Sequence, residues 1–178
     1  LAEPLGLGRP GWHAECAAMA WAVCGTSVDV LAGGADLAFP HHAYQAAMVE
    51  AASGVAPFAR RQAHWGEVRL DGVKMAKSTG NLVLVADLLA EHRPAAVRLL
   101  LLHRAWAEAW DYRAEELRSA EALLDSLYAA AGRAGDDGAD AVLDRLLDDL
   151  DVPGAVAVAL DRGGAAARAL LRVLKLDA

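Results

Sequence analysis

Cysteine is scarce in this chain of 178 residues, which contains two, Cys16 and Cys24. The two cysteines are eight positions apart, which on one helix separates them by about 12 Å, beyond the reach of a disulfide. The sequence therefore excludes a secreted fold held together by disulfides. An initiating methionine is also missing, because the chain begins with Leu1. We therefore expect the chain to be a piece of a longer protein.

Long apolar runs and an excess of positive charge are missing too. The longest charge-free apolar stretch, residues 16–28, has 13 residues and is too short to span a bilayer. The 17 basic against 24 acidic residues give a net charge of −7, which disfavours a broad nucleic-acid or anionic-membrane surface. We predict a cytoplasmic, monomeric globular protein without a membrane partner, for which nucleic acid is disfavoured as a partner.

The first eighty residues alternate between helical and strand-like patterns. Helices are expected over residues 13–24 and 41–52, strands over residues 27–31 and 61–65, and a hairpin over residues 67–73 that turns at Asp71-Gly72. Gly33 and Gly34 are expected to form a tight turn after the first strand. This order predicts an α/β fold with part of a parallel sheet.

The rest of the chain has a helical pattern, so we place domains over residues 1–81 and 82–178. Helices are expected over residues 95–107 and 114–131, then a loop over 132–140 and short helices interrupted at Pro153-Gly154 and Gly163-Gly164. This region is acidic and holds Asp136, Asp137, Asp140, Asp144, Asp148, Asp149, Asp151 and Asp161. Such a surface repels phosphate backbones.

Basic residues gather instead around one segment, residues 74–81, which contains Lys74 and Lys77 followed by Ser78, Thr79 and Gly80. We call it the lysine loop. Two ammonium groups beside hydroxyl and amide donors suit a polyphosphate whose charge grows during transfer. A charged and merely solvated hairpin is the alternative.

Two further clusters contain residue types that bind ligands. Cys16 with His41 and His42 offers thiolate and imidazole ligands for zinc, with His13, Glu15 and Gln45 as candidate third ligands; a buried cysteine with capping histidines is the alternative. Gly34, Ala35 and Asp36 follow a strand, where a carboxylate binds ribose hydroxyls, unless the glycines form a plain turn. Trp12 is either the wall of a small pocket or a core residue.

Three segments of the chain resemble a known family. They hold Gly8, Arg9, Pro10, Gly11, Trp12, His13, Glu15 and Cys16; Gly33, Gly34, Asp36, Leu37, Phe39, Pro40, His41 and His42; and Asp71, Gly72, Lys74, Met75, Lys77, Ser78, Gly80 and Asn81. In order and spacing they resemble the later half of the cysteinyl-tRNA synthetase catalytic domain. Residues 81–85, 106–110 and 148–155 are more similar to the related ligases of mycothiol biosynthesis, which join L-cysteine to glucosaminyl-inositol.

The resemblance implies the closing half of a Rossmann-like class I synthetase domain, followed by an all-α helical bundle. It implies activation of L-cysteine by ATP, with Mg²⁺, to cysteinyl-adenylate, and ligation to the amine of glucosaminyl-inositol. Zinc bound by Cys16 and His41 would select the cysteine thiol, and Trp12 would line the cysteine pocket. The implied nucleotide-binding residues are Gly34, Ala35, Asp36, the backbone of Val68, and Lys77, with Lys77 and Lys74 as the catalytic pair that neutralises the phosphates.

The chain departs from the family pattern in three respects. Gln45 stands where synthetases place a glutamate zinc ligand, and Ala76 replaces the serine of the lysine loop. Ala32, Ala43 and Leu31 stand where relatives usually have glycine, glutamate and a polar residue. The ATP-binding histidine signature and the first zinc cysteine lie upstream in the family. A cysteinyl-tRNA synthetase and a degenerate, non-catalytic zinc- and nucleotide-binding module therefore stay as alternatives; the acidic and short region after the lysine loop disfavours the former.

Overall fold

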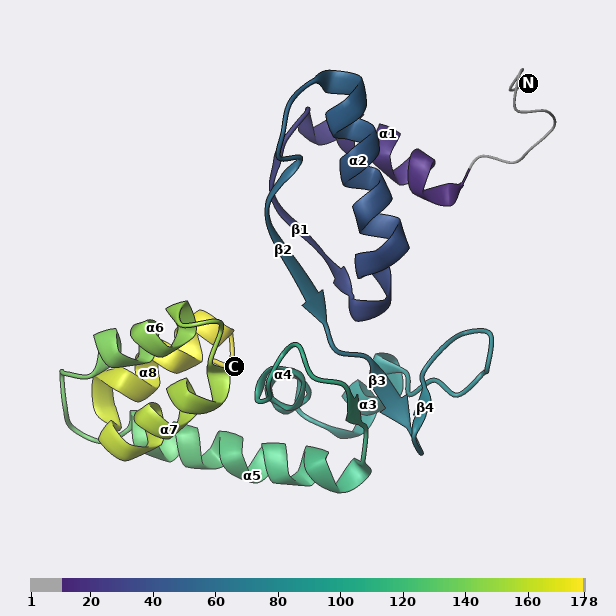
Figure 1. The fold of residues 1–178 in the computed structure, drawn as a ribbon. Coiled ribbons are helices and arrows are strands. Elements are labelled where there is room, and N and C mark those ends of the chain that lie inside the picture. Colours follow the sequence, from purple (N-terminus) through teal and green to yellow (C-terminus); the bar gives the residue numbers. More distant parts are fainter. Residues whose placement is uncertain (1–10, 178) are drawn as a thin grey trace, which may run out of the picture. The chain divides into compact units, whose positions relative to one another are not determined.

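The computed structural model describes residues 11–177, so Gly8, Arg9 and Pro10 of the first motif lie outside the described residues. The chain forms two compact units, Leu1–Gly66 and Glu67–Ala178 (Figure 1). The observed division lies ahead of the domain boundary expected after Asn81. The reason is that the segment carrying the lysine loop pairs with a strand of the second unit, as described below.

The first unit contains a two-stranded parallel sheet. Strand β1 (Val28–Gly34) pairs with β2 (Ala59–Trp65), and helices α1 (Trp12–Cys24) and α2 (Ala43–Ser53) belong to the same unit. The predicted parallel pairing is confirmed, and α2 provides the crossover that parallel strands require. Ala17, Val49 and Phe58 form its buried apolar centre.

Two local predictions for the first unit are wrong in detail. Gly33 and Gly34 do not form a tight turn, because they continue β1 and pair with His64 and Trp65. The chain turns afterwards, through a 3₁₀ helix (Ala35–Leu37) and a π-helical turn (Ala38–His42) that leads into α2. His41 therefore lies in this turn and not in the first turn of a regular α-helix.

The sheet of the second unit has the strand order β4-β3-β5. The predicted hairpin is confirmed as β3 (Val68–Leu70) and β4 (Val73–Lys74), and its turn residues Asp71 and Gly72 both have positive φ, as a tight hairpin requires. Strand β5 (Trp110–Asp111) has no counterpart among the predicted elements. It pairs in parallel with β3, and the Asp111 carboxylate accepts a hydrogen bond from the Gly72 amide at 2.6 Å.

Helices make up the rest of the second unit: α3 (Val85–Glu91), α4 (Pro94–Leu102), α5 (Ala114–Ala131), α6 (Ala139–Leu147), α7 (Val152–Arg162) and α8 (Gly164–Leu174). Helix α5 is confirmed over its predicted residues, whereas α4 ends at Leu102, before the predicted end at Ala107. The predicted break at Pro153-Gly154 is wrong. Both residues lie in the first turn of α7, where proline costs no hydrogen bond and Asp151 caps the Gly154 amide at 2.9 Å.

A continuous apolar core joins helices α4 to α8 within this unit. It includes Leu99, Leu117, Leu124, Leu127 and Leu170, all fully buried. Across residues 11–177, the structure contains no helix with both the length and the apolar composition needed to traverse a bilayer.

Candidate functional site

Trp12, His41 and Gln45 come together in the first unit. The Trp12 indole stacks on the His41 imidazole with ring centroids 3.5 Å apart and planes 23° apart. Gln45, on the first turn of α2, places its side-chain carboxamide within hydrogen-bond distance of the ring, with 2.6 Å between Gln45 Nε2 and His41 Nε2. His41 and Gln45 are buried, whereas Trp12 is 59% exposed, so the indole covers a buried polar pair from the outside.

The second ring nitrogen of His41 is not satisfied by any residue from 11 to 177. Within the described residues, His41 Nδ1 is the buried side-chain nitrogen that no hydrogen bond satisfies. Burial lowers the pKa of His41, and the nearby His13 lowers it further, so the ring is neutral at pH 7. In the tautomer that carries its proton on Nε2 and donates it to the carboxamide oxygen of Gln45, the neutral imidazole presents the Nδ1 lone pair to a metal ion or a ligand group.

The donor set fits zinc only in part. Cys16 lies one turn after Trp12 on α1 and is half-buried, so its thiol is accessible. His13 packs edge-on against Tyr44, with ring centroids 5.0 Å apart. Residues 11–177 contain no group of three or more His, Cys, Asp or Glu side chains that could hold a metal. Within these residues neither His13 nor Glu15 completes a set of three ligands with Cys16 and His41, so a zinc site here would need ligands from outside this segment.

Gln45→Ala tests the pairing with His41. The substitution leaves both nitrogens of a buried imidazole without a partner, so we expect the free energy of unfolding to fall by about 1–3 kcal/mol. Urea unfolding of the full-length protein measures this change. Gln62→Ala is the matched control, because Gln62 is the other glutamine of the chain and is exposed on β2. Equal stability of the two variants would contradict the pairing.

The glycines at the end of β1 make room for side chains of the same unit. A Cβ at Gly33 would lie 2.8 Å from Cε1 of His42, and a Cβ at Gly34 would lie 2.6 Å from Oδ1 of Asp36. Because Gly33 lacks a side chain, His42 reaches His64 on β2, and their Nδ1 and Nε2 atoms share a hydrogen bond of 2.9 Å. Gly34 leaves the Asp36 carboxylate close to the strand end, where the sequence predicts a nucleoside.

His64 is a residue that sequence reasoning missed. It is half-buried, and its partner His42 has a pKa lowered by burial first, then by His64 and His41. In the sequence, His64 could have been identified as a candidate only from its position near the end of the second parallel strand. Residues there meet those at the end of β1, since carboxyl ends of parallel strands share one edge.

The second unit holds Val68, Lys74 and Lys77. The Val68 carbonyl accepts a hydrogen bond from the Met75 amide at 2.9 Å, which ties the start of the lysine loop to β3. Lys74 ends β4, and Lys77 lies in the turn that follows; both are exposed. The structure therefore brings these three predicted residues into one hairpin and its adjoining loop.

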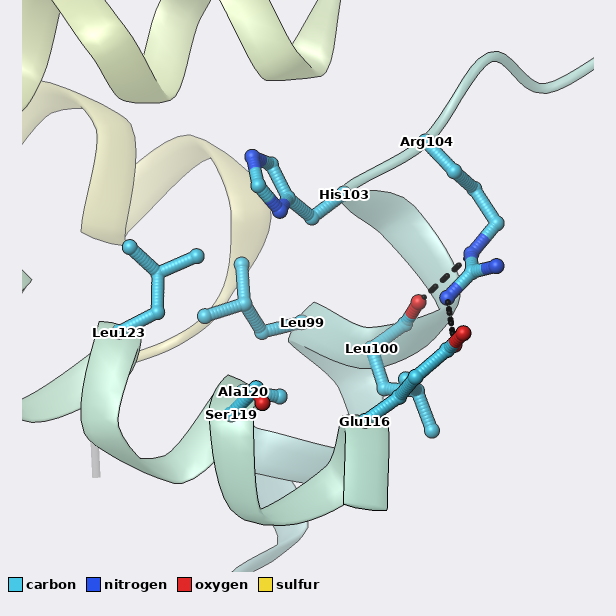
Figure 2. A pocket seen from close by; sticks show the side chains of 8 residues that line it. All are labelled: Leu99, Leu100, His103, Arg104, Glu116, Ser119, Ala120 and Leu123. Carbon is cyan, nitrogen blue, oxygen red and sulfur yellow. Dashed lines mark hydrogen bonds and ion pairs between the residues drawn. The ribbon is translucent and has the colours of Figure 1, made fainter. Parts of the chain in front are cut away.

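A cavity of about 380 Å³ lies between α4 and α5 in the same unit (Figure 2). Leucines and an alanine line it, together with His103, Arg104, Glu116 and Ser119. The Arg104 guanidinium stacks on Trp110 of β5 at 3.5 Å, donates to the Leu100 carbonyl at 2.9 Å and pairs with Glu116 at 3.2 Å. Arg104 therefore links the β-sheet of this unit to both helices.

His103 gives this unit a stability that depends on pH. Burial lowers the pKa of His103, and Arg104 lowers it further, so the folded ring stays neutral where an unfolded ring, with a pKa near 6.5, binds a proton. The unfolded state then holds more protons, and stability falls as pH falls below about 6.5. We expect His103→Gln to flatten that part of the profile, measured by urea unfolding between about pH 5 and 8. An unchanged slope would contradict the expectation.

Comparisons with known proteins give consistent results. A family model described as tRNA synthetases class I (C) catalytic domain matches residues 1–122. The chain is 46% identical to an L-cysteine:1D-myo-inositol 2-amino-2-deoxy-alpha-D-glucopyranoside ligase of Thermobispora bispora, over 96% of this chain and 44% of that protein. It is 47% identical to the ligase of the same name from Streptosporangium roseum, over 88% of this chain and 39% of that protein. The chain thus spans less than half the length of these relatives.

A solved structure shares the fold. The leucyl-tRNA synthetase of Agrobacterium radiobacter K84, in a ternary complex with tRNA and LeuAMS, matches with a TM-score of 0.58 and 16% sequence identity. The match covers 83% of this chain and 26% of that one. At this identity the likeness concerns the fold alone, which is the mixed α/β fold of class I synthetases.

Proposed function

Because the chain belongs to the class I (C) tRNA synthetase catalytic-domain family, we propose that it is part of an enzyme that activates L-cysteine with ATP. The cysteine carboxylate attacks the α-phosphate, and pyrophosphate leaves, which gives cysteinyl-adenylate. The amine of glucosaminyl-inositol then attacks the acyl carbon, AMP leaves, and an amide forms with release of one proton. The names of the relatives, which are cysteine ligases of an amino-sugar inositol, support this acceptor.

In this proposal the chain supplies the closing half of the Rossmann-like domain and the helical bundle that follows it in the sequence. The rest of the longer protein supplies the opening half. The two-stranded parallel sheet of the first unit is consistent with this assignment, since so small a sheet is a fragment of the open sheets typical of such domains.

Cysteine is recognised by residues of the first unit. Cys16 and His41 hold zinc together with ligands from outside this segment, and Trp12 walls the pocket. When bound, zinc supplies a soft, thiol-preferring acceptor that a serine hydroxyl does not match. Trp12 keeps the His41 ring in place by stacking, and Gln45 fixes its orientation through Nε2. These contacts set the ring orientation before substrate arrives.

Nucleotide-binding residues are assigned in each unit. In the first, Gly34 and Ala35 allow the ribose to approach the backbone, and the Asp36 carboxylate accepts hydrogen bonds from its hydroxyls. In the second, the backbone of Val68 contacts the adenine. Lys77, assisted by Lys74 and by Mg²⁺ on the ATP, neutralises the charge that grows on the α-phosphate and the leaving pyrophosphate.

One observation carries the proposal. His41 is buried, neutral and stacked under Trp12, and its Nδ1 has no partner among the described residues. An unsatisfied buried polar atom costs about 1–3 kcal/mol, so a structural histidine would be expected to have both nitrogens satisfied. Binding of a metal ion to His41 Nδ1, in the tautomer that carries its proton on Nε2, would offset that cost.

The test uses the full-length protein and measures ATP–pyrophosphate exchange with cysteine and with serine. We expect exchange with cysteine alone, and release of AMP once glucosaminyl-inositol is added. Cysteinyl-tRNA in place of the amide product would support a tRNA synthetase instead. Zinc binding without any exchange would support the non-catalytic module, for which Gln45 and Ala76 are the sequence grounds.

A further inference from the structure

Asn81 is the only asparagine in the chain, and its side chain makes four hydrogen bonds to residues 73–79. Its Oδ1 accepts from the Ala76 amide at 3.0 Å and from the Thr79 hydroxyl at 2.5 Å. Its Nδ2 donates to the carbonyls of Val73 at 3.3 Å and Lys74 at 3.1 Å. One carboxamide thus bridges the end of β4 and the turn that follows it.

These bonds fix the backbone on both sides of Met75. The Lys74 carbonyl precedes Met75 and the Ala76 amide follows it, and both end on the Asn81 carboxamide. The remaining hydrogen bonds of the turn converge on the Ala76 carbonyl, which accepts from the amides of Thr79 and Gly80. Without Asn81, the turn that carries Lys77 would keep its internal bonds but lose its side-chain tie to the strand that carries Lys74.

We infer that Asn81 is the positioning residue of the lysine loop, which sets the backbone of Lys77 against that of Lys74. The inference rests on the proposed function, because the purpose of this spacing is to direct two ammonium groups at one triphosphate. The backbone of Lys74 is held in β4 by its pairing with Arg69, and the Asn81 carboxamide ties the exposed turn that carries Lys77 to that strand. A displacement of about 1 Å of a catalytic group costs roughly 10²-fold in rate, which gives a clamp of four hydrogen bonds a catalytic purpose.

Asn81→Ala tests the clamp by two independent measurements on the full-length protein. The first is hydrogen exchange at the Ala76 amide, which we expect to speed up because its acceptor is removed. The second is the kinetics of ATP–pyrophosphate exchange, where we expect kcat to fall by about 10²-fold. The KM for cysteine should stay unchanged, because Trp12, Cys16 and His41 belong to the other unit.

Asn81→Asp separates the two halves of the clamp. Aspartate keeps an oxygen acceptor for the Ala76 amide and loses both donations to the strand. We expect the Ala76 amide to stay protected while kcat still falls. Ser126→Ala is the matched control, since it removes a side-chain bond to a backbone carbonyl, that of Ala122 at 2.9 Å, on an exposed face of α5. It should change neither measurement.

The outcomes distinguish the clamp from the proposed function. If the wild type shows cysteine-dependent exchange but Asn81→Ala retains its kcat, the positioning role is wrong and the function stands. A lowered melting temperature with unchanged kcat also overturns the positioning role, because it shows a structural bond only. If the wild type shows no exchange, the proposed function fails. Hydrogen exchange at the Ala76 amide then decides alone whether the clamp exists.

Discussion

Lys77→Ala is expected to slow ATP–pyrophosphate exchange by the full-length protein by about 10²- to 10³-fold, the usual loss when one donor to a developing charge is removed. The ammonium group meets negative charge that increases as pyrophosphate leaves, so its effect is larger in the transition state than in the bound ground state. The loss should therefore appear in kcat, with a smaller change in the KM for ATP. Steady-state exchange at varied ATP measures both.

A lysine far from the loop in the sequence provides the control for charge. Lys175 is one of the three lysines of the chain and lies at the end of α8. Lys175→Ala changes the net charge by the same amount and should leave exchange unaltered. Because Lys77 is exposed, Lys77→Ala should also unfold at the wild-type temperature. If both variants lose activity equally, general electrostatics explain the result and Lys77 has no specific role.

The hairpin under the lysine loop shows what a sequence predicts well. Asp71-Gly72 between two short β-branched segments specifies a tight turn, because both positions need positive φ and these residues adopt it readily. The residues that specify this turn are adjacent in the sequence, and the predicted turn is confirmed. Strand β5 has two residues and escapes prediction, since its pairing with β3 depends on Trp110 and Asp111, about forty residues further along the chain.

The glycine and proline pairs show where local signals mislead. Gly33-Gly34 resembles a turn, but the absent side chains serve the close approach of His42 and Asp36 to the end of β1. Pro153-Gly154 resembles a helix break, yet Asp151 caps the helix that starts there, and a proline in the first turn costs nothing. A glycine pair fits either a turn or a close approach of side chains, and a proline fits either a helix break or a helix start. Residues nearby in the folded structure decide which of the two forms.

The candidate site is predictable as a set of residue types and not as a set of contacts. Cys16, His41 and the lysines are identified from their chemistry and from the resemblance. The bonds of His41 to Gln45, of His42 to His64 and of Asn81 to the loop depend on turns and on strand register. Side-chain partners of this kind are set by tertiary structure, which no periodicity in the sequence encodes.

Cys16→Ser is the second substitution with a large expected effect. A serine hydroxyl is a poor zinc ligand, because it stays protonated at neutral pH where a metal-bound thiol does not. Removal of an outer-shell partner already costs up to about 10²-fold in metal affinity, so the loss of a direct ligand should cost at least that. Competition against a chromophoric chelator, with the full-length protein, measures this affinity without reference to activity.

Cys24→Ser is the control for Cys16→Ser, because it makes the same chemical change at a different position. Both cysteines lie on α1, but Cys24 is exposed at the end of the helix, so its substitution should leave zinc affinity and the preference for cysteine over serine unchanged.

In Cys16→Ser, adenylate formation with cysteine should fall toward the rate with serine, since the thiol of the substrate no longer meets a correctly bound metal. If Cys16→Ser kept both its zinc and its discrimination against serine, then Cys16 would be a packing residue of α1, and cysteine would have to be selected by shape alone. A pocket that selects by shape distinguishes side chains of such similar size by only a few kcal/mol, which makes the metal the stronger explanation.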